Sequence, residues 1–104
     1  MHHEDKGAFT GETSPSMLAT ICQFVILGHS ERRQFFAESD EAVSRKIQAA
    51  QRVGLRPIVC VGERLEEREA GSAEQVVEGQ LRQSLEGVAI VEGLVVAYEP
   101  VWAI

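Results

Sequence analysis

Three short runs of apolar residues limit this sequence to a small set of folds. They are nearly continuous and recur at similar spacing, at Phe24–Leu27, Ile58–Val61 and Leu94–Tyr98. A continuous apolar run, in contrast to an alternating one, is typical of a strand that is covered on both faces, as in parallel sheets. Parallel strands are joined by right-handed crossovers, usually through a helix. We therefore expect an α/β fold, although three strands alone do not distinguish an open sheet from a closed barrel.

The segment between the first two runs predicts a helix with defined ends. Ser39 is a favourable N-cap, and the acidic residues Asp40 and Glu41 follow it in the first turn. Gly54 is placed to end the helix, and Pro57 prevents it from resuming. The apolar face of this helix is formed by Val43, Ile47 and Ala50.

Helix signals also precede the first and third runs. Ser14 followed by Pro15 predicts a short helix before the first run, because proline suits the first helical position. Ser72 and Gln75 have the spacing of a capping box ahead of a longer helix before the third run. The expected order is therefore helix, strand, helix, strand, helix, strand. The apolar residues are Met17, Leu18 and Ile21 on the first of these helices and Val77, Leu81 and Leu85 on the other.

Composition and charge exclude several classes of function. With 44% hydrophobic and 25% charged residues, residues 1–104 have the composition of one soluble globular domain. The net charge of -6, without a run of lysine or arginine, argues against a nucleic-acid surface. No apolar run approaches the roughly 20 residues of a membrane span, and the start "MHHEDKG" is too polar for a secretory signal. We expect a cytoplasmic protein with no membrane partner.

The cysteines fit a reducing compartment, and the histidines near the start do not predict a metal site. Cys22 and Cys60 each lie in or beside an apolar run, where a buried, reduced thiol is more common than a disulfide. His2 and His3 stand next to acidic residues, but neighbouring histidines on a loop do not converge easily on one ion. We expect an exposed polar segment there and no metal site.

Polar groups follow each apolar run, at the positions where α/β proteins collect their chemistry. The carboxyl ends of parallel strands meet at one edge of a sheet, and here they continue as "GHSERR", "GERLEER" and "EPVW". These segments bring His29, Glu31, Glu63 and Glu99 to that edge. No G-x-G-x-x-G or G-x-x-x-x-G-K-[ST] pattern follows any run, so dinucleotide and P-loop sites have no support.

Each of these residues also has a purely structural interpretation. His29 has the position of a helix-capping histidine as well as that of a catalytic one. Glu99 is harder to explain structurally, because a carboxylate on a buried strand is costly unless it is paired or lies in a cleft. Glu63 and Arg64 are typical of solvated charges at a helix start that form local pairs. Glu31 is placed to pair with an arginine of "SERR", although such an arginine is also placed to hold an anion.

Four motifs together resemble one known family. "GAFTGE" at Gly7–Glu12, "VILGHSERR", "PIVCVGE" and "AYEPVWAI" occur in the order and at the separations that are typical of triosephosphate isomerases. The resemblance covers the chain from end to end and implies a (β/α)₈ TIM barrel, which takes about 250 residues. The 104 residues would supply the fourth, fifth and sixth strands, with Met1 in the loop after the third. We therefore expect a partial TIM barrel of about three βα units that does not close.

The resemblance also implies a reaction. Triosephosphate isomerases interconvert dihydroxyacetone phosphate and glyceraldehyde 3-phosphate in glycolysis and gluconeogenesis, through an enediol and with no metal or organic cofactor. Glu99 resembles the carboxylate base that moves the carbon-bound proton between neighbouring carbons. His29 resembles the neutral imidazole that polarises the substrate carbonyl and moves protons between its oxygens.

Further residues resemble supporting positions of the family. Ser30 and Glu31 are similar to the neighbours of the electrophilic histidine, and Cys60 is similar to the buried cysteine beneath the catalytic carboxylate. Thr10 resembles the loop tip that enters the site of the partner subunit, which implies a homodimer for the full-length protein. A lid over the substrate phosphate excludes water from the intermediate. Its first hinge is similar to Pro100, Val101 and Trp102.

Two hypotheses of different class follow. In the first, the chain is the central fragment of an isomerase. The 104 residues alone would then be inactive, because they lack the family's first-strand lysine and its glycine-rich phosphate-binding loops. In the second, the chain is a non-catalytic module that associates with other barrel subunits through exposed strand edges and the Gly7–Glu12 loop. The coding sequence upstream of Met1 and downstream of Ile104 distinguishes the two.

Overall fold

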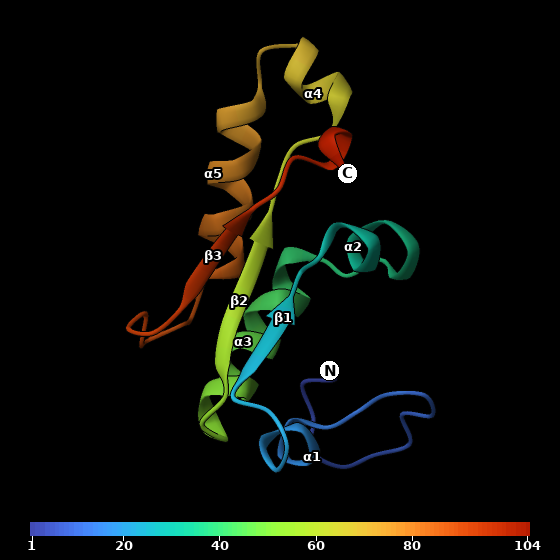
Figure 1. Cartoon of the computed structure of the whole chain (residues 1–104), viewed down its shortest axis with the longest axis vertical. Helices are drawn as coiled ribbons and strands as arrows, with labels where there is room; N and C mark the ends of the chain where they lie inside the picture. The colour runs from blue at the N-terminus through green and yellow to red at the C-terminus, as the bar shows by residue number, and fades with distance from the viewer.

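Three parallel strands form the framework of the molecule. The structure, a computed structural model, describes residues 1–104 (Figure 1). Strands β1 (Phe24–Leu27), β2 (Arg56–Val61) and β3 (Val95–Tyr98) lie in the order β1-β2-β3, with Ile58 of β2 paired to both neighbours. The α/β alternation predicted from the apolar runs is confirmed. The sheet does not close, and the outer edges of β1 and β3 are free of a strand partner.

Two long helices make the crossovers and short helices follow the strands. Helix α3 connects β1 to β2, and α5 connects β2 to β3. The short elements α2, α4 and η1 come after β1, β2 and β3 respectively, so each strand end leads into a helical turn. None of the helices combines the length and the apolar character needed to cross a bilayer. The helices are α1 (Pro15–Ala19), α2 (Ser30–Phe36), α3 (Asp40–Arg52), α4 (Leu65–Glu69), α5 (Ala73–Ser84) and the 3-10 turn η1 (Val101–Ala103).

Helix α3 forms as the sequence predicts. The Ser39 hydroxyl accepts a hydrogen bond from the Ala42 backbone N–H at 3.1 Å, and two acidic residues occupy the first turn. The helix ends at Arg52, ahead of Gly54. Its predicted apolar face is fully buried, which contributes roughly 1.5–3 kcal/mol for each large aliphatic side chain. The residues with no exposed surface on that face are Val43, Ile47 and Ala50.

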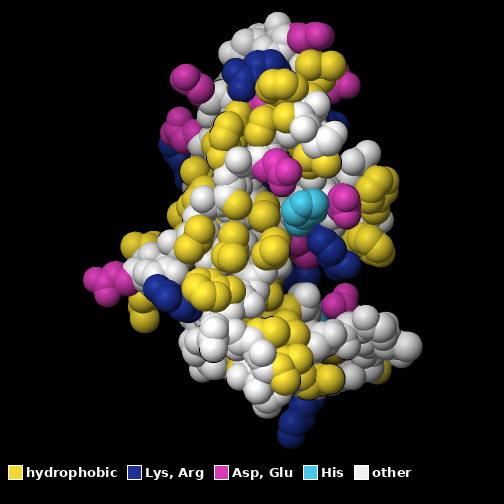
Figure 2. All heavy atoms as spheres, viewed as in Figure 1, with side chains coloured by type: hydrophobic (Ala, Val, Ile, Leu, Met, Phe, Trp, Pro, Cys, Tyr) yellow, Lys and Arg dark blue, Asp and Glu magenta, His cyan; other side chains and the backbone are white.

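The hydrophobic core lies between α3 and one face of the sheet. Its members from the strands are the inward residues of β1 and β2, which meet the apolar face of α3. The opposite face carries Phe24 and Ile26, which are 44% and 61% exposed, so the expectation of strands covered on both faces is wrong here. Hydrophobic side chains gather over this open face (Figure 2). The core cluster consists of Val25, Leu27, Val43, Ile47, Ala50, Leu55 and Val59.

Two local predictions from the sequence are wrong, each for a local reason. Ser72 precedes α5 at the N-cap position but makes no side-chain cap. Its hydroxyl donates instead to the Glu67 carbonyl at 3.0 Å, because α4 ends only three residues earlier. Cys22 is exposed, since it lies in the turn before β1 and outside the core, whereas Cys60 is buried as expected. The short helix α1 is confirmed, with Ser14 accepting from the Met17 N–H at 3.2 Å.

A buried ion pair joins the end of β1 to α3. Glu38 and Lys46 are 7% and 6% exposed, and the Lys46 ammonium donates to one Glu38 carboxylate oxygen. The other oxygen accepts from the Gly28 N–H at 3.0 Å. Burial alone would raise the pKa of Glu38, but the hydrogen bond and charge of Lys46, with Gly28 and Arg32, hold this pKa below its ordinary value.

Replacing Lys46 by Met should reduce the free energy of unfolding of the full-length protein by about 3–5 kcal/mol, because Glu38 would be left buried without its main partner. The difference should shrink in acid. The pKa of Glu38 is depressed in the folded state, so its stabilisation is complete above the unfolded-state pKa and is lost as pH falls through the folded-state value. Urea unfolding between neutral and acidic pH measures both effects.

Arg45→Met is the matched control for this experiment. Arg45 stands next to Lys46 in the chain and pairs with Glu41 on the exposed side of the same helix. Loss of such a surface pair should cost less than about 1 kcal/mol. Equal losses in the two variants would contradict the assigned role of the buried pair.

Candidate active site

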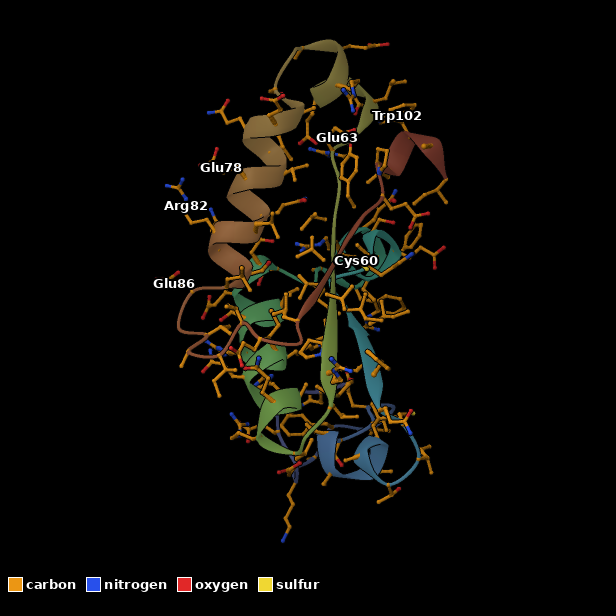
Figure 3. All side chains as sticks on the ribbon, turned by 60° about the vertical axis from the view of Figure 1, so that its left-hand side comes forward. Cys60, Glu63, Glu78, Arg82, Glu86 and Trp102 are labelled. Carbon is orange, nitrogen blue, oxygen red and sulfur yellow. The ribbon has the colours of Figure 1, made fainter.

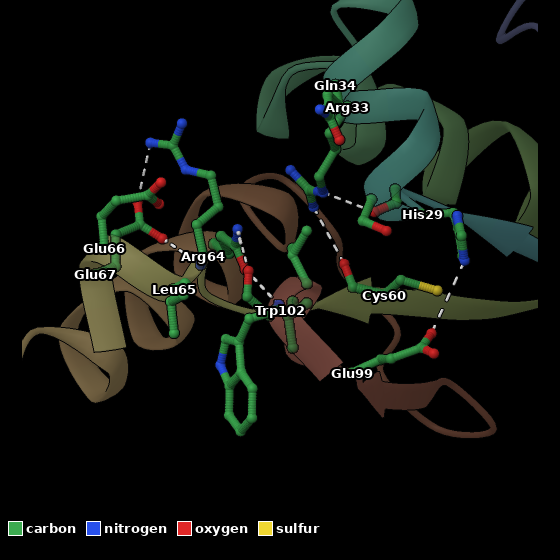
Figure 4. A pocket seen from close by; sticks show the side chains of 16 residues that line it. His29, Arg33, Gln34, Cys60, Arg64, Leu65, Glu66, Glu67, Glu99 and Trp102 are labelled. Carbon is green, nitrogen blue, oxygen red and sulfur yellow. Dashed lines mark hydrogen bonds and ion pairs between the residues drawn. The ribbon is translucent and has the colours of Figure 1, made fainter. Parts of the chain in front are cut away.

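The structure brings His29 and Glu99 together at the carboxyl edge of the sheet. His29 comes two residues after the end of β1, and Glu99 comes directly after β3. Their side chains approach across β2, with 3.9 Å between His29 Nε2 and Glu99 Oε2 (Figure 4). Both remain accessible, with 31% and 53% of their side-chain surfaces exposed. An imidazole and a carboxylate therefore face one point in space from different strands.

His29 is both a helix cap and a member of this pair. Its Nδ1 accepts a hydrogen bond from the Glu31 backbone N–H at 3.3 Å, at the start of α2. A neutral imidazole that accepts through Nδ1 carries its proton on Nε2, which is the atom that faces Glu99. The cap thus fixes the tautomer and leaves one N–H donor directed into the site. The capping interpretation of this histidine is confirmed, and the catalytic one stays a prediction.

Arg33 links the ends of the first two strands beneath the site. Its Nε donates to the Gly28 carbonyl at 2.6 Å, and its Nη2 donates to the Cys60 carbonyl at 3.2 Å. Its Nη1 donates to Asp40 at the start of α3 at 2.5 Å. Gly28 has a φ of +71°, and a side chain there would meet the Arg33 guanidinium. The turn into His29 is therefore held by one guanidinium.

The predicted pairing of Glu31 with an arginine of "SERR" is wrong. Glu31 is exposed and makes no ion pair, while Arg32 lies 3.6 Å from Glu38 and Arg33 pairs with Asp40. Residues one or two positions apart on a helix point in different directions, so these side chains do not meet. Both arginines are paired with carboxylates, so neither is free to bind an anion.

Glu63 is a buried anchor rather than a solvated helix-start charge. It has no exposed surface and accepts hydrogen bonds from the Tyr98 hydroxyl at 2.7 Å and the Trp102 indole at 2.6 Å (Figure 3). Arg68 lies 3.6 Å away. The prediction was wrong because the partners are distant in the sequence: Tyr98 is the last residue of β3, and Trp102 lies in η1 after it. Tyr98 and Trp102 both carry polar tips on aromatic rings, which was the only signal in the sequence.

These contacts perturb two ionisable groups. The Tyr98 hydroxyl is the largest cause of a lowered pKa at Glu63; burial acts in the opposite direction, and the Trp102 N–H adds to the lowering. Conversely, the hydrogen bond to Glu63 raises the pKa of Tyr98, and burial adds to that change. The Val101 N–H also donates to the Glu63 carbonyl at 2.9 Å. Glu63 is therefore an ionised carboxylate that fixes the segment after Glu99.

The remaining predicted residues divide between the cleft and other places. Ser30 is the first residue of α2 and lines the cleft, whereas Glu31 lies outside it. Cys60 is 8% exposed, and burial, followed by the charge of Glu99, raises the pKa of its thiol. Thr10 is exposed, and it belongs to the segment before α1, which lies at the opposite end of the sheet (Figure 1). It does not contribute to the cleft of its own chain. The predicted hinge residues Pro100, Val101 and Trp102 form the N-cap and first positions of η1.

The cleft around this pair suits a small ligand. It has a volume of about 640 Å³ and is lined by residues from all three strand ends, from α4 and from α5. No group of three or more histidine, cysteine, aspartate or glutamate residues is arranged to hold a metal ion. Two arginines line the cleft. The second of them, Arg64, pairs with Glu67 at 3.3 Å. Proton transfer between a carboxylate and a ligand polarised by an imidazole is the chemistry that these groups support.

Comparison with known proteins identifies the family. The sequence profile described as "Triosephosphate isomerase" matches residues 1–104. This chain belongs to the triosephosphate isomerase family. Triosephosphate isomerase from Herpetosiphon aurantiacus is 59% identical over 107 residues, which cover 100% of this chain and 43% of that protein. The enzyme of the same name from Synechococcus sp. (strain JA-2-3B'a(2-13)) is 56% identical over 105 residues and is covered to 42%.

A solved structure supports the same assignment. The crystal structure of triosephosphate isomerase from Bartonella henselae superposes with a TM-score of 0.91 at 47% sequence identity. The alignment covers 97% of this chain and 43% of that one. The resemblance of the four motifs to triosephosphate isomerases is confirmed, and so is the expected partial TIM barrel. The chain spans less than half the length of its triosephosphate isomerase relatives.

The hydrogen bonds that hold Glu63 can be tested by NMR titration. Tyr98→Phe and Trp102→Phe each remove a donor that stabilises the carboxylate, so each should raise the pKa of Glu63 toward its ordinary value. The effect should be larger for Tyr98→Phe, because its hydroxyl is the larger cause. A carbon-13 titration of the Glu63 carboxyl in the full-length protein measures this. Phe35→Leu, at an exposed aromatic on α2, is the control. An unaltered titration in Tyr98→Phe would contradict the assignment.

Proposed function

We propose that the full-length protein containing these residues interconverts dihydroxyacetone phosphate and glyceraldehyde 3-phosphate, in glycolysis and gluconeogenesis. The observation that carries the proposal is the approach of His29 Nε2 to Glu99 Oε2 within one cleft at the carboxyl edge of the sheet. Active sites of (β/α)₈ barrels lie at that edge. Membership of the triosephosphate isomerase family supports this assignment of the substrate.

The two side chains divide the reaction between them. Glu99 removes a proton from the carbon next to the carbonyl, while the Nε2–H of His29 donates to the carbonyl oxygen, and an enediol forms. His29 then moves protons between the two oxygens, and Glu99 returns its proton to the neighbouring carbon. The substrate is isomerised with no net gain or loss of protons. A carboxylate base and an imidazole donor positioned in this way each contribute to the rate through general acid–base catalysis.

Glu99 must lose water before it becomes an effective base. About half of its side chain, 53%, is exposed in the open cleft. Closure of a lid that begins at Pro100, Val101 and Trp102 would remove this water and retain the enediol. Cys60 lies beneath the carboxylate as a packing residue, and Ser30 follows the imidazole. Glu31 serves His29 indirectly, because its backbone N–H fixes the tautomer.

The phosphate of the substrate must be held by groups outside these residues. The two arginines that line the cleft, Arg33 and Arg64, are already paired with Asp40 and Glu67. A phosphate dianion normally requires a free cation or several backbone N–H groups. A first-strand lysine and glycine-rich loops of the full-length protein are proposed to supply them. The exposed Thr10 loop is proposed to complete the partner's site in a cytoplasmic homodimer that needs no metal or cofactor.

Glu99→Gln in the full-length protein should lower kcat by about 10²–10⁴-fold, because an amide cannot accept the carbon-bound proton. A coupled assay that follows glyceraldehyde 3-phosphate measures the effect. Glu92→Gln makes the same chemical change at an exposed position before β3, and its activity should equal that of the parent. Full activity in the Glu99 variant would remove the basis of the proposed function.

The 104 residues expressed alone should show no isomerase activity above background. The cleft supplies a base and an imidazole but no unpaired cation for the phosphate. The same coupled assay, performed at high protein concentration, tests this. Turnover that disappears with Glu99→Gln in this short chain would show that the other groups are dispensable.

A further inference from the structure

The backbone at the end of β2 and just beyond it is hydrogen-bonded on two sides where it passes the site. Toward β3, the Val61 carbonyl accepts from the Glu99 N–H at 2.9 Å, and the Glu63 carbonyl accepts from the Val101 N–H at 2.9 Å. These bonds extend the ladder between the strands beyond the end of β3. Gly62 lies between them. Its own polar groups are directed elsewhere, to a side chain of α5.

Gln80 bonds both polar groups of Gly62. Its Oε1 accepts from the Gly62 N–H at 2.9 Å, and its Nε2 donates to the Gly62 carbonyl at 3.3 Å. The side chain is partly buried and lines the cleft, although it belongs to a crossover helix. A side-chain amide that binds the N–H and C=O of one residue performs the task that a neighbouring strand performs in a sheet. Gln80 therefore fixes the position of this residue relative to α5.

Gly62 in turn lies directly against the backbone of Glu99. A Cβ atom added to Gly62 would be 2.0 Å from the Glu99 carbonyl oxygen and 3.1 Å from Pro100 Cα. Real Cβ atoms do not approach this closely, so the two chain segments are in contact with no room for a side chain. A displacement of Gly62 therefore changes the position available to Glu99. The contact extends from α5, through Gly62, to the proposed base.

We propose that Gln80 is a positioning residue, which holds Gly62 against the backbone of Glu99 and thereby sets the position of the Glu99 carboxylate relative to His29. This inference rests on the proposed role of Glu99 as the base. Gln80 acts through Gly62 and has no chemical part in the reaction. The separation of 3.9 Å between the two functional groups is the quantity that it controls.

Gln80→Met in the full-length protein is the decisive variant. Methionine keeps a side chain of similar length on α5 but can form neither bond to Gly62. We expect kcat to fall by about 10- to 100-fold, since misplacement of a catalytic group by about 1 Å has an effect of this order. KM should change little, because the loss falls on the chemical step. Hydrogen exchange at the Gly62 amide should become faster.

Gln83→Met is the matched control, because Gln83 is an exposed glutamine near Gln80 on the same helix. It should leave kcat, KM and exchange at Gly62 as they are in the parent. If Gln80→Met does not fold, Gln80→Asn replaces it: the amide is kept but is one methylene too short to reach both groups. The same fall in kcat is expected from it.

Two readouts separate this inference from the proposed function. Exchange at Gly62 and the crystallographic distance between His29 and Glu99 do not depend on turnover. A Gln80 variant in which Gly62 and Glu99 stay in place, or in which they move while kcat is retained, overturns the positioning role. So does a fall in activity that only follows a fall in the folded fraction. Full activity of Glu99→Gln instead overturns the proposed function, and the exchange at Gly62 still reports on the contact.

Discussion

The parallel pairing of β2 with both of its neighbours is the constraint on which the rest of the molecule depends. Because all three strands run in one direction, their carboxyl ends reach the same edge, and residues far apart in the chain meet there. The same direction obliges the chain to return through α3 and α5, and α3 buries the inward residues of β1 and β2, whereas β3 stays largely exposed. The other face stays open, with apolar residues on it (Figure 2). The parallel pairing of the three strands thus determines where the site, the core and the exposed apolar surface lie.

Much of the framework could be predicted from local sequence. The bounds of β1 agree with its apolar run, and α3 begins after the predicted Ser39 cap and buries the predicted face. These features depend on periodicity and capping, which act over a few residues. The location of His29 and Glu99 at the carboxyl edge of the sheet was also predicted, because the sequence shows that each of them follows an apolar run. Their separation in space follows from the order of the strands.

Features that depend on the return of a distant segment could not be predicted. Glu63 is buried by Tyr98 and Trp102, which come more than thirty residues later and approach only after β3 has paired with β2. The role of Gln80 has the same origin, because one glutamine among several on α5 gives no local sign that it faces a strand end. Ser72 does not cap α5 with its side chain, because its hydroxyl donates to the carbonyl of Glu67 in the neighbouring α4. In each case a tertiary contact overrode a local preference.

The close contact at Gly62 has a consequence for the outer surface of the protein. The segment that supports Glu99 is continuous with Glu63, which anchors the start of the proposed hinge, and both are joined through Gln80 to a helix on the covered side of the sheet. The proposed base and the proposed hinge are therefore supported by neighbouring residues at the end of β2. A change at Gln80 made for solubility or heat resistance would therefore also alter the support of Glu99, whereas an exposed position of α5 such as Gln83 can be changed without that effect.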